Sequence, residues 1–233
     1  MMATAFPSRS YHDRRGRLEA YFDRAASKTW ERLTSDAPVS GIRATVRAGR
    51  NRMRDTLLSW LPADMTGLRL LDAGCGTGAL AVEAARRGAD VVAIDVAGSL
   101  VSVARNRAPQ GMSIDWRVGD MLDPALGRFD HVVAMDSLIH YSAFDIVATV
   151  QQLAERTCGS LLLTFAPSSL PLEMMHTVGK LFPRGDRAPA IEPVRERLLR
   201  TLIGNAMPGA SIGRGERIGS GFYTSHALEV LPA

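Results

Sequence analysis

The sequence predicts an α/β protein built on a largely parallel β-sheet, and three observations support this prediction. The chain has 233 residues, of which 46% are hydrophobic, enough for one domain to bury its own core. From residue 68 onward, short apolar runs alternate with helical patterns, as in parallel sheets covered by helices on both faces. Residues 212–231 instead alternate around a Ser220-Gly221 turn, which predicts an antiparallel hairpin at the end of the chain.

The apolar runs and the helical patterns follow one another in a regular order. The predicted strands are 68–73, 91–95, 131–136 and 160–166, with a further strand before Asp120. The predicted helices are 78–87, 98–107, 144–156, 171–182 and 193–205. No linker or internal repeat interrupts this order, so the sequence predicts one domain that follows an N-terminal helical cap.

The N-terminal cap is predicted from two amphipathic patterns. Apolar residues recur at three- and four-residue steps from Leu18 to Leu33 and again from Ile42 to Leu61. The first 60 residues hold 12 basic and 6 acidic side chains, whereas the remaining 173 hold 16 and 18. One row of the second helix is basic throughout: Arg43, Arg47, Arg50 and Arg54. Because like charges at this spacing weaken a helix, both an anionic partner and a solvated face remain open explanations.

Composition excludes several classes of protein. Cys75 and Cys158 are too few for a disulfide framework or a zinc site, so we expect no metal centre and a reducing compartment. No apolar run approaches the length of a membrane-spanning helix, and the N-terminus lacks the apolar centre of a signal peptide. We therefore expect a cytoplasmic protein that touches a membrane at most peripherally.

A glycine-rich loop follows the first predicted strand and opens the next helix. It contains Gly74, Cys75, Gly76 and Gly78, and its spacing also satisfies a dinucleotide fingerprint. Asp72 separates the two possibilities, because a carboxylate there repels a pyrophosphate but attracts the ammonium and sulfonium of S-adenosylmethionine. The loop is therefore predicted to bind S-adenosylmethionine.

Three more aspartates end or closely follow predicted strands, where ligands of parallel sheets bind. Asp95 is placed to accept hydrogen bonds from both ribose hydroxyls of the cofactor. Asp120 could accept a proton from the adenine amine, with Met121 packing on the ring. Asp136 completes the predicted cofactor-binding set. Each aspartate taken alone could instead cap a helix.

The motifs LLDAGCGTG, VVAID, VGDM and FDHVVAMD resemble those of Class I S-adenosylmethionine-dependent methyltransferases over residues 50–233. This resemblance implies a Rossmann-like seven-stranded sheet, parallel except for one antiparallel C-terminal strand. A closer resemblance, to the magnesium-protoporphyrin IX O-methyltransferases of chlorophyll and bacteriochlorophyll synthesis, covers almost the whole chain from Tyr21. Its specific stretches are 21–54, 136–141, 181–193 and 221–229. It implies a cap or arm at 1–60 and a methyltransferase domain at 61–233, with a substrate-side insertion at 167–211.

The closer resemblance also implies a reaction and its residues. The enzyme esterifies one propionate of magnesium-protoporphyrin, and a propionate with a pKa of about 4–4.5 needs no general base at neutral pH. His140 could orient the propionate or approach the magnesium from the axial side, and Tyr21 could close the pocket. The arginine row, Met174 and Phe182 are the candidate substrate contacts. The porphyrin-binding subunit of magnesium chelatase and the photosynthetic membrane surface are the implied partners.

Three other functions remain open at this stage. The acceptor could be another small molecule such as a quinone precursor, or the protein could be a porphyrin-binding chelatase partner without catalysis. The basic N-terminal quarter suggests a nucleic-acid methyltransferase. However, Asp136-Ser137-Leu138-Ile139 stands where such an enzyme would carry an N-P-P-Y-like element, so nucleic acid is not an expected partner.

Overall fold

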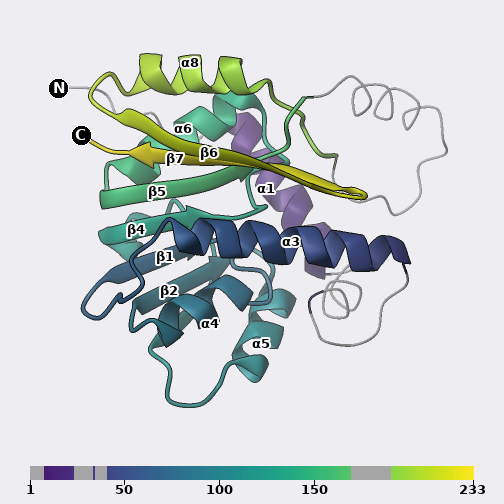
Figure 1. Cartoon of the computed structure of the whole chain (residues 1–233), viewed down its shortest axis with the longest axis vertical. Coiled ribbons are helices and arrows are strands. Elements are labelled where there is room, and N and C mark those ends of the chain that lie inside the picture. Colours follow the sequence, from purple (N-terminus) through teal and green to yellow (C-terminus); the bar gives the residue numbers. More distant parts are fainter. Residues whose placement is uncertain (1–7, 24–33, 35–40, 169–189) are drawn as a thin grey trace.

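The computed structural model describes residues 8–23, 34, 41–168 and 190–233. Its strands are β1 (Arg69–Ala73), β2 (Asp90–Asp95), β3 (Ile114–Val118), β4 (Phe129–Ala134), β5 (Thr157–Phe165), β6 (Ser211–Ser220) and β7 (Tyr223–Leu231). They form one sheet in the order β3-β2-β1-β4-β5-β7-β6 (Figure 1). The strand β7 runs antiparallel to both neighbours, and the other pairs are parallel. The predicted fold class is confirmed, including the C-terminal hairpin.

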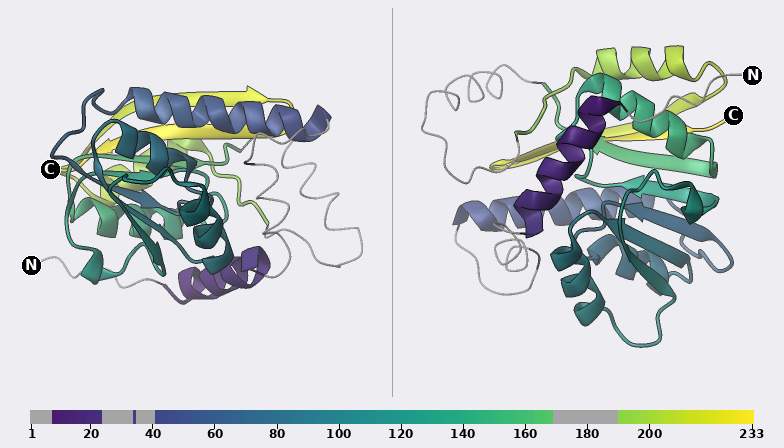
Figure 2. Two further views of the ribbon diagram at one scale, coloured as in Figure 1. Left: turned by 90° about the horizontal axis from the view of Figure 1, so that it is seen from below. Right: turned by 180° about the vertical axis from the view of Figure 1, so that it is seen from behind.

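Helices cover both faces of this sheet. The described helices are α1 (Arg9–Tyr21), α3 (Gly41–Ser59), α4 (Ala79–Arg86), α5 (Gly98–Arg107), α6 (Ala143–Ala154) and α8 (Glu196–Ala206), with a short 3-10 turn, η2 (Pro124–Leu126). The two N-terminal helices, α1 and α3, lie on opposite sides of the sheet (Figure 2). The helix predicted at 171–182 lies outside the described residues.

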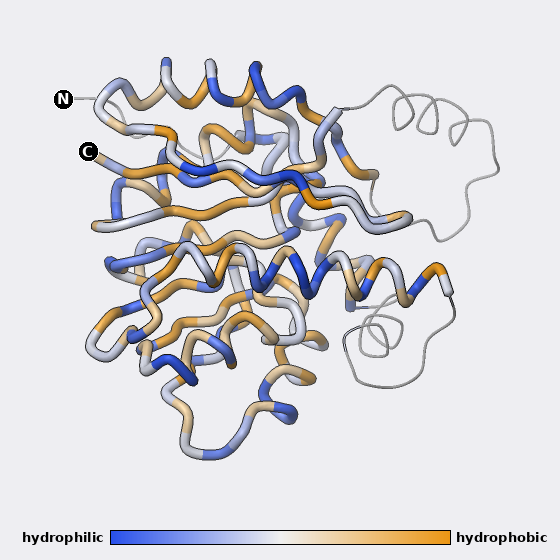
Figure 3. Tube along the Cα trace, in the orientation of Figure 1, coloured by the Kyte–Doolittle hydropathy of each residue, from blue (hydrophilic) through white to orange (hydrophobic). Residues whose placement is uncertain are grey.

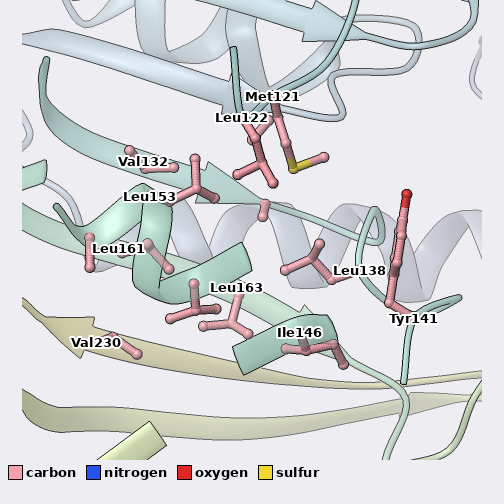
Figure 4. Packing of buried hydrophobic residues seen from close by; sticks show 14 of the residues in the cluster. Met121, Leu122, Val132, Leu138, Tyr141, Ile146, Leu153, Leu161, Leu163 and Val230 are labelled. Atoms are coloured by element: carbon pink, nitrogen blue, oxygen red, sulfur yellow. The ribbon is translucent and has the colours of Figure 1, made fainter. Parts of the chain in front are cut away.

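Two buried clusters, one on each face, hold the layers together. Successive residues of a strand point to opposite faces, so Leu70 joins one cluster and Leu71 the other. The central strands are mainly hydrophobic along their length, whereas α3 alternates between hydrophobic and hydrophilic segments (Figure 3). Figure 4 shows the cluster between the sheet and α6, which includes Leu138, Leu163 and Tyr141.

The second amphipathic pattern of the N-terminal cap is largely confirmed. Met53, Leu57 and Leu58 are at most 1% exposed and belong to the cluster that α3 shares with α4 and the sheet. The expectation for Ile42 is wrong: it is 58% exposed, and the end of α3 that carries it projects beyond the sheet in Figure 1. The packed half of α3 is therefore a layer of the main core, while the division of the chain at residue 60 stays a prediction.

The first helix begins earlier than its apolar pattern indicates. Ser8 caps α1, with its hydroxyl accepting a hydrogen bond from the backbone N–H of Tyr11. Only Tyr11 and Leu18 are buried on this helix, so it lacks the broad apolar stripe from which a helix is normally recognised. The rest of the first apolar pattern, at 24–33, lies outside the described residues.

Candidate active site

The glycine-rich loop lies between β1 and α4, at the carboxyl edge of the sheet where β1 separates β2 from β4. The backbone N–H groups of Gly74 and Cys75 both donate to the carbonyl of Ile94, at 2.8 and 3.0 Å. Gly74 and Gly78 have φ angles of +89° and +80°, which glycine adopts without strain. A Cβ on Gly74 would lie 2.3 Å from the Cβ of Ser137, and one on Gly78 would lie 2.4 Å from the ring of Trp116. Both glycines are therefore required by conformation and by close packing.

The middle glycine of the loop faces a different environment. Gly76 has φ of +53°, and no heavy atom lies within 4 Å of the position its Cβ would occupy. Its backbone N–H donates to Oδ2 of Asp95 at 2.8 Å, while Oδ1 of the same carboxylate accepts the N–H of Ala97 at 2.9 Å. Asp95 thus ties the loop to the start of α5 and leaves open space over Gly76. A ligand can approach the loop backbone closely from that side.

Asp72 lies beneath this loop. It is 2% exposed, and its Oδ2 accepts the backbone N–H of Ala81 at 3.1 Å. Burial, reinforced by the nearby charge of Asp95, raises the pKa of Asp72 to about 7. Burial also raises the pKa of Asp95 and that of the Cys75 thiol, which remains protonated. The structure thus shows Asp72 and Cys75 buried at the loop, and their predicted roles toward a cofactor stay predictions.

Asp120 follows β3 and is held by a helix that the sequence did not connect with it. Its Oδ1 accepts the hydroxyl of Tyr11 at 2.7 Å and the N–H of Leu122 at 2.9 Å. Its Oδ2 forms an ion pair with Arg15 at 2.8 Å. Met121 is 8% exposed and packs into the adjoining core, at the rim of the cluster in Figure 4. Tyr11 and Arg15 lie more than 100 residues away in sequence, and only the N-cap Ser8 signals their helix locally.

Asp136 lies at the end of β4, where protein groups surround its carboxylate. Its Oδ2 pairs with Arg50 of α3 at 2.8 Å, and its Oδ1 accepts the hydroxyl of Tyr223 from β7 at 3.0 Å. The hydroxyl of Thr164 accepts the Asp136 N–H at 2.7 Å. Asp136 also has a φ of +54°, a strained conformation for a residue with a Cβ. The structure thus shows Asp136 joining three elements, and its predicted contact with the cofactor stays a prediction.

His140 and Tyr21 meet around one aromatic ring. His140 is 9% exposed and lies on the turn between β4 and α6, with its ring 6.5 Å from that of Phe22. The ring of Tyr21, at the end of α1, lies 5.1 Å from the same Phe22 ring. Nδ1 of His140 lies 3.2 Å from the carbonyl oxygen of Ala190, which can only accept, so in a neutral ring this contact requires the proton on Nδ1. In that tautomer Nε2 carries the lone pair.

The arginine row of α3 is divided by the fold. Arg50 reaches Asp136, and Arg54 donates to its neighbour Asp55 at 2.9 and 3.0 Å. Arg43 is exposed near the projecting end of the helix. Arg47, which lies between Arg43 and Arg50 in the row, is half-buried. Of the two open explanations for this row, an anionic partner is supplied in part by the chain's own Asp136 and Asp55. The other candidate substrate contacts, Met174 and Phe182, lie outside the described residues.

Two features are not found among the residues that the structure describes. Within 8–23, 34, 41–168 and 190–233, no group of three or more His, Cys, Asp or Glu side chains is arranged to hold a metal ion. Over the same part of the chain, every helix is too short or too polar to span a bilayer.

The seven-stranded fold and the glycine loop are those of an S-adenosylmethionine-dependent methyltransferase. In agreement, a family model for the methyltransferase domain matches residues 70–157. A second family model, described as the C-terminus of magnesium-protoporphyrin IX methyltransferase, matches residues 134–232.

Known proteins give a more specific result. The magnesium-protoporphyrin O-methyltransferase of Rhodobacter capsulatus is 48% identical over 95% of this chain and 98% of its own length. That of Synechocystis is 30% identical over 91% of this chain and 93% of its own. The crystal structure of the Synechocystis magnesium protoporphyrin IX methyltransferase with bound SAH superposes with a TM-score of 0.82 at 29% identity, covering 94% of this chain and 99% of that one. The chain belongs to the magnesium-protoporphyrin O-methyltransferase family.

Proposed function

We propose that this protein transfers the methyl group of S-adenosylmethionine to a propionate of magnesium-protoporphyrin IX, giving the monomethyl ester in chlorophyll or bacteriochlorophyll synthesis. The choice of acceptor is supported by family membership, which rests on a match over 95% of the chain. The loop at Gly74–Gly78, tied to Asp95 and open over Gly76, supports the cofactor. A dinucleotide is disfavoured because the buried carboxyl group of Asp72 and the half-buried one of Asp95 both lie close to the loop.

Residues of three loops bind different parts of the cofactor. Asp95 accepts the ribose hydroxyls in addition to its two backbone donors, and Asp120 accepts the adenine amine while Met121 packs on the ring. Cys75 is the small residue between Gly74 and Gly76, and Asp72 favours the cationic methionine end. When bound, the cofactor supplies an electrophilic methyl carbon on a sulfonium. The reacting propionate oxygen attacks that carbon, and the carbon–sulfur bond breaks with its electron pair moving to sulfur.

The protein's own task is positioning and the exclusion of water. A propionate is already ionised at neutral pH, so holding oxygen, carbon and sulfur in line can lower the barrier by several kcal/mol. The His140 tautomer favours one of the two roles predicted for it. Because Nδ1 donates to Ala190, the lone pair on Nε2 suits the magnesium of the porphyrin better than a carboxylate. Tyr21, whose ring contacts that of Phe22, closes the pocket in this proposal.

Arg43 and Arg47 of the α3 arginine row bind the propionates in this proposal, whereas Arg50 and Arg54 pair with Asp136 and Asp55. Met174 and Phe182 supply apolar walls for the macrocycle. The same end of the molecule contacts the porphyrin-binding subunit of magnesium chelatase and the surface of the photosynthetic membrane. The exposed Arg43 and Ile42 at the projecting end of α3 support a surface contact of this kind. Co-sedimentation with the purified subunit, and separately with anionic vesicles, tests these two contacts.

Incubation of the purified protein with labelled S-adenosylmethionine and magnesium-protoporphyrin tests the function. Mass analysis should detect a single added methyl ester, together with S-adenosylhomocysteine. A parallel reaction with a ubiquinone precursor serves as the control acceptor. Methylation of the quinone alone would replace the proposed acceptor, and porphyrin binding without turnover would support a non-catalytic chelatase partner.

A further inference from the structure

The helix α1 is anchored to segments that follow strands β3, β4 and β5, of which β4 and β5 are neighbours in the sheet. Ser8 and Ser10 donate to the carboxylate of Asp145 at the start of α6. The ring of Tyr11 stacks on that of Tyr141, with centroids 5.1 Å apart and planes at 25°. Arg14 pairs with Glu192, ahead of α8. The helix therefore connects the segments that follow β4 and β5.

Its most direct contact with the proposed cofactor site is through Asp120. Tyr11 is 2% exposed, and burial together with the charge of Asp120 raises its pKa, so its hydroxyl remains a donor. Tyr11, Arg15 and the N–H of Leu122 donate three hydrogen bonds to one carboxylate. A carboxylate offers about four acceptor positions, so one remains on Oδ2. An adenine amine can be accepted there without breaking any of the three existing bonds.

We propose that Tyr11 and Arg15 are positioning residues that hold Asp120 in the orientation required to recognise the adenine amine. This inference rests on the proposed cofactor. Without the two side chains, the Asp120 carboxylate is fixed by a single backbone donor and can rotate, so part of the binding free energy is spent on ordering it. Coupling is reciprocal, so the cofactor must in turn stabilise the docked position of α1.

The test compares two ligands that differ at the recognised amine. S-adenosylhomocysteine carries the amine, whereas S-inosylhomocysteine carries a carbonyl oxygen that would face the Asp120 carboxylate. By calorimetry, the wild-type protein should bind the adenosyl ligand about tenfold or more tightly than the inosyl ligand, as expected for a charged hydrogen bond. Tyr11→Phe keeps the ring on Tyr141 but removes the hydroxyl, and should reduce this ratio at least about threefold. Arg15→Gln should reduce the adenosyl-to-inosyl ratio more than Tyr11→Phe does.

Two variants of the same helix serve as controls. Arg9 is 96% exposed and pairs only loosely with Asp13, so Arg9→Gln should leave both the ratio and the melting temperature unchanged. Ser10→Ala removes a contact to Asp145 and should lower the melting temperature while leaving the ratio intact. Tyr11→Phe should raise the KM for S-adenosylmethionine more than it lowers kcat, because the positioning acts on cofactor binding.

Two results would overturn the inference. One is an adenosyl-to-inosyl ratio in Tyr11→Phe equal to that of the wild type, and the other is a wild-type protein that binds both ligands equally. No porphyrin is present in these measurements, so either result leaves the proposed acceptor untouched. A wild-type protein that binds neither ligand would instead contradict the proposed cofactor.

Discussion

His140 illustrates how one contact selects between two roles at the residue scale. In a neutral ring the carbonyl of Ala190 requires the proton on Nδ1, and the proposed function assigns the lone pair on Nε2 to the porphyrin magnesium. We expect His140→Ala to lower turnover of magnesium-protoporphyrin about 10- to 100-fold, as misplacement of a reactant does. Its affinity for S-adenosylhomocysteine should stay within about twofold of the wild type, because the contacts with Ala190 and Phe22 lie apart from the glycine loop.

Metal-free protoporphyrin is the control substrate for this variant. If His140 acts on the magnesium, its loss should affect the metal-free substrate much less. An equal decrease in turnover for both substrates would indicate that His140 orients the propionate. Unchanged turnover would indicate that His140 has a structural role only.

Asp72 gives a pH dependence whose sign follows from its burial. Its pKa is about 7 in the folded protein and 3.8 in the unfolded chain, so between these values the folded state binds more protons. The free energy of unfolding contributed by Asp72 therefore decreases as pH rises from about 4 to about 7. Asp72→Asn cannot titrate but keeps an acceptor for the N–H of Ala81.

Thermal melts of both proteins at about pH 5 and about pH 8 isolate this contribution, because every other titrating group is shared. Relative to Asp72→Asn, the wild type should lose at least about 2 °C between the lower and the higher pH. Equal changes in the melting temperature of the wild type and Asp72→Asn would show that the Asp72 carboxyl group does not titrate as described.

The site could be predicted from sequence only where its signal is local. Asp95 and the glycines follow apolar strands at short, fixed distances, and the structure brings them into direct contact. Tyr11, Arg15 and Tyr223 were not predicted, because each reaches its aspartate across more than 80 residues of chain. No local periodicity encodes such a contact. The surroundings of Asp136 were missed for the same reason.

At the scale of elements, burial pattern decided which predictions succeeded. Strands β1, β2, β4 and β5 are buried on both faces over most of their length, which is why continuous apolar runs revealed them. The strand β3 lies at the sheet edge and is partly exposed along its length, so its sequence gave only an approximate position. The helix α1 is held mainly by polar side chains, and hydrophobic periodicity therefore locates it poorly.

The crossing of α3 over β7 yields a stability prediction. A Cβ on Gly49 would lie 2.4 Å from Cδ1 of Tyr223, and that ring is anchored by the bond between its hydroxyl and Asp136. Although alanine favours a helix by about 1 kcal/mol, we expect Gly49→Ala to lower the free energy of unfolding by about 1 kcal/mol or more. Urea denaturation measures the change.

Gly204 is the matched control. It lies in α8 with nothing within 4 Å of its missing Cβ, so Gly204→Ala should raise the free energy of unfolding by about 0.5–1 kcal/mol. If Gly49→Ala were stabilising to the same extent, α3 would not be packed against Tyr223 as described.

At the scale of the whole molecule, basic residues of the N-terminal quarter form ion pairs with acidic residues in the rest of the chain. Ion pairs from the basic N-terminal quarter to the rest of the chain include Arg14–Glu192, Arg15–Asp120 and Arg50–Asp136. These pairs are at most half exposed and join both faces of the sheet to α1 and α3. The N-terminal quarter is thus bound to the domain on both faces by ion pairs and by apolar packing together.

Two truncated chains test whether that quarter is separable. A chain beginning at residue 61 lacks Met53, Leu57 and Leu58, each at most 1% exposed in the core. Loss of one such side chain costs about 2–5 kcal/mol, whereas a typical domain is stable by about 5–15 kcal/mol. We therefore expect this chain to show no cooperative urea transition. A chain beginning at residue 24 lacks α1 but keeps Met53, Leu57 and Leu58, so it should keep a cooperative transition and near-ultraviolet circular dichroism. A cooperative transition in the shorter chain would make residues 1–60 a dispensable cap and contradict the role of α3 as a layer of the core.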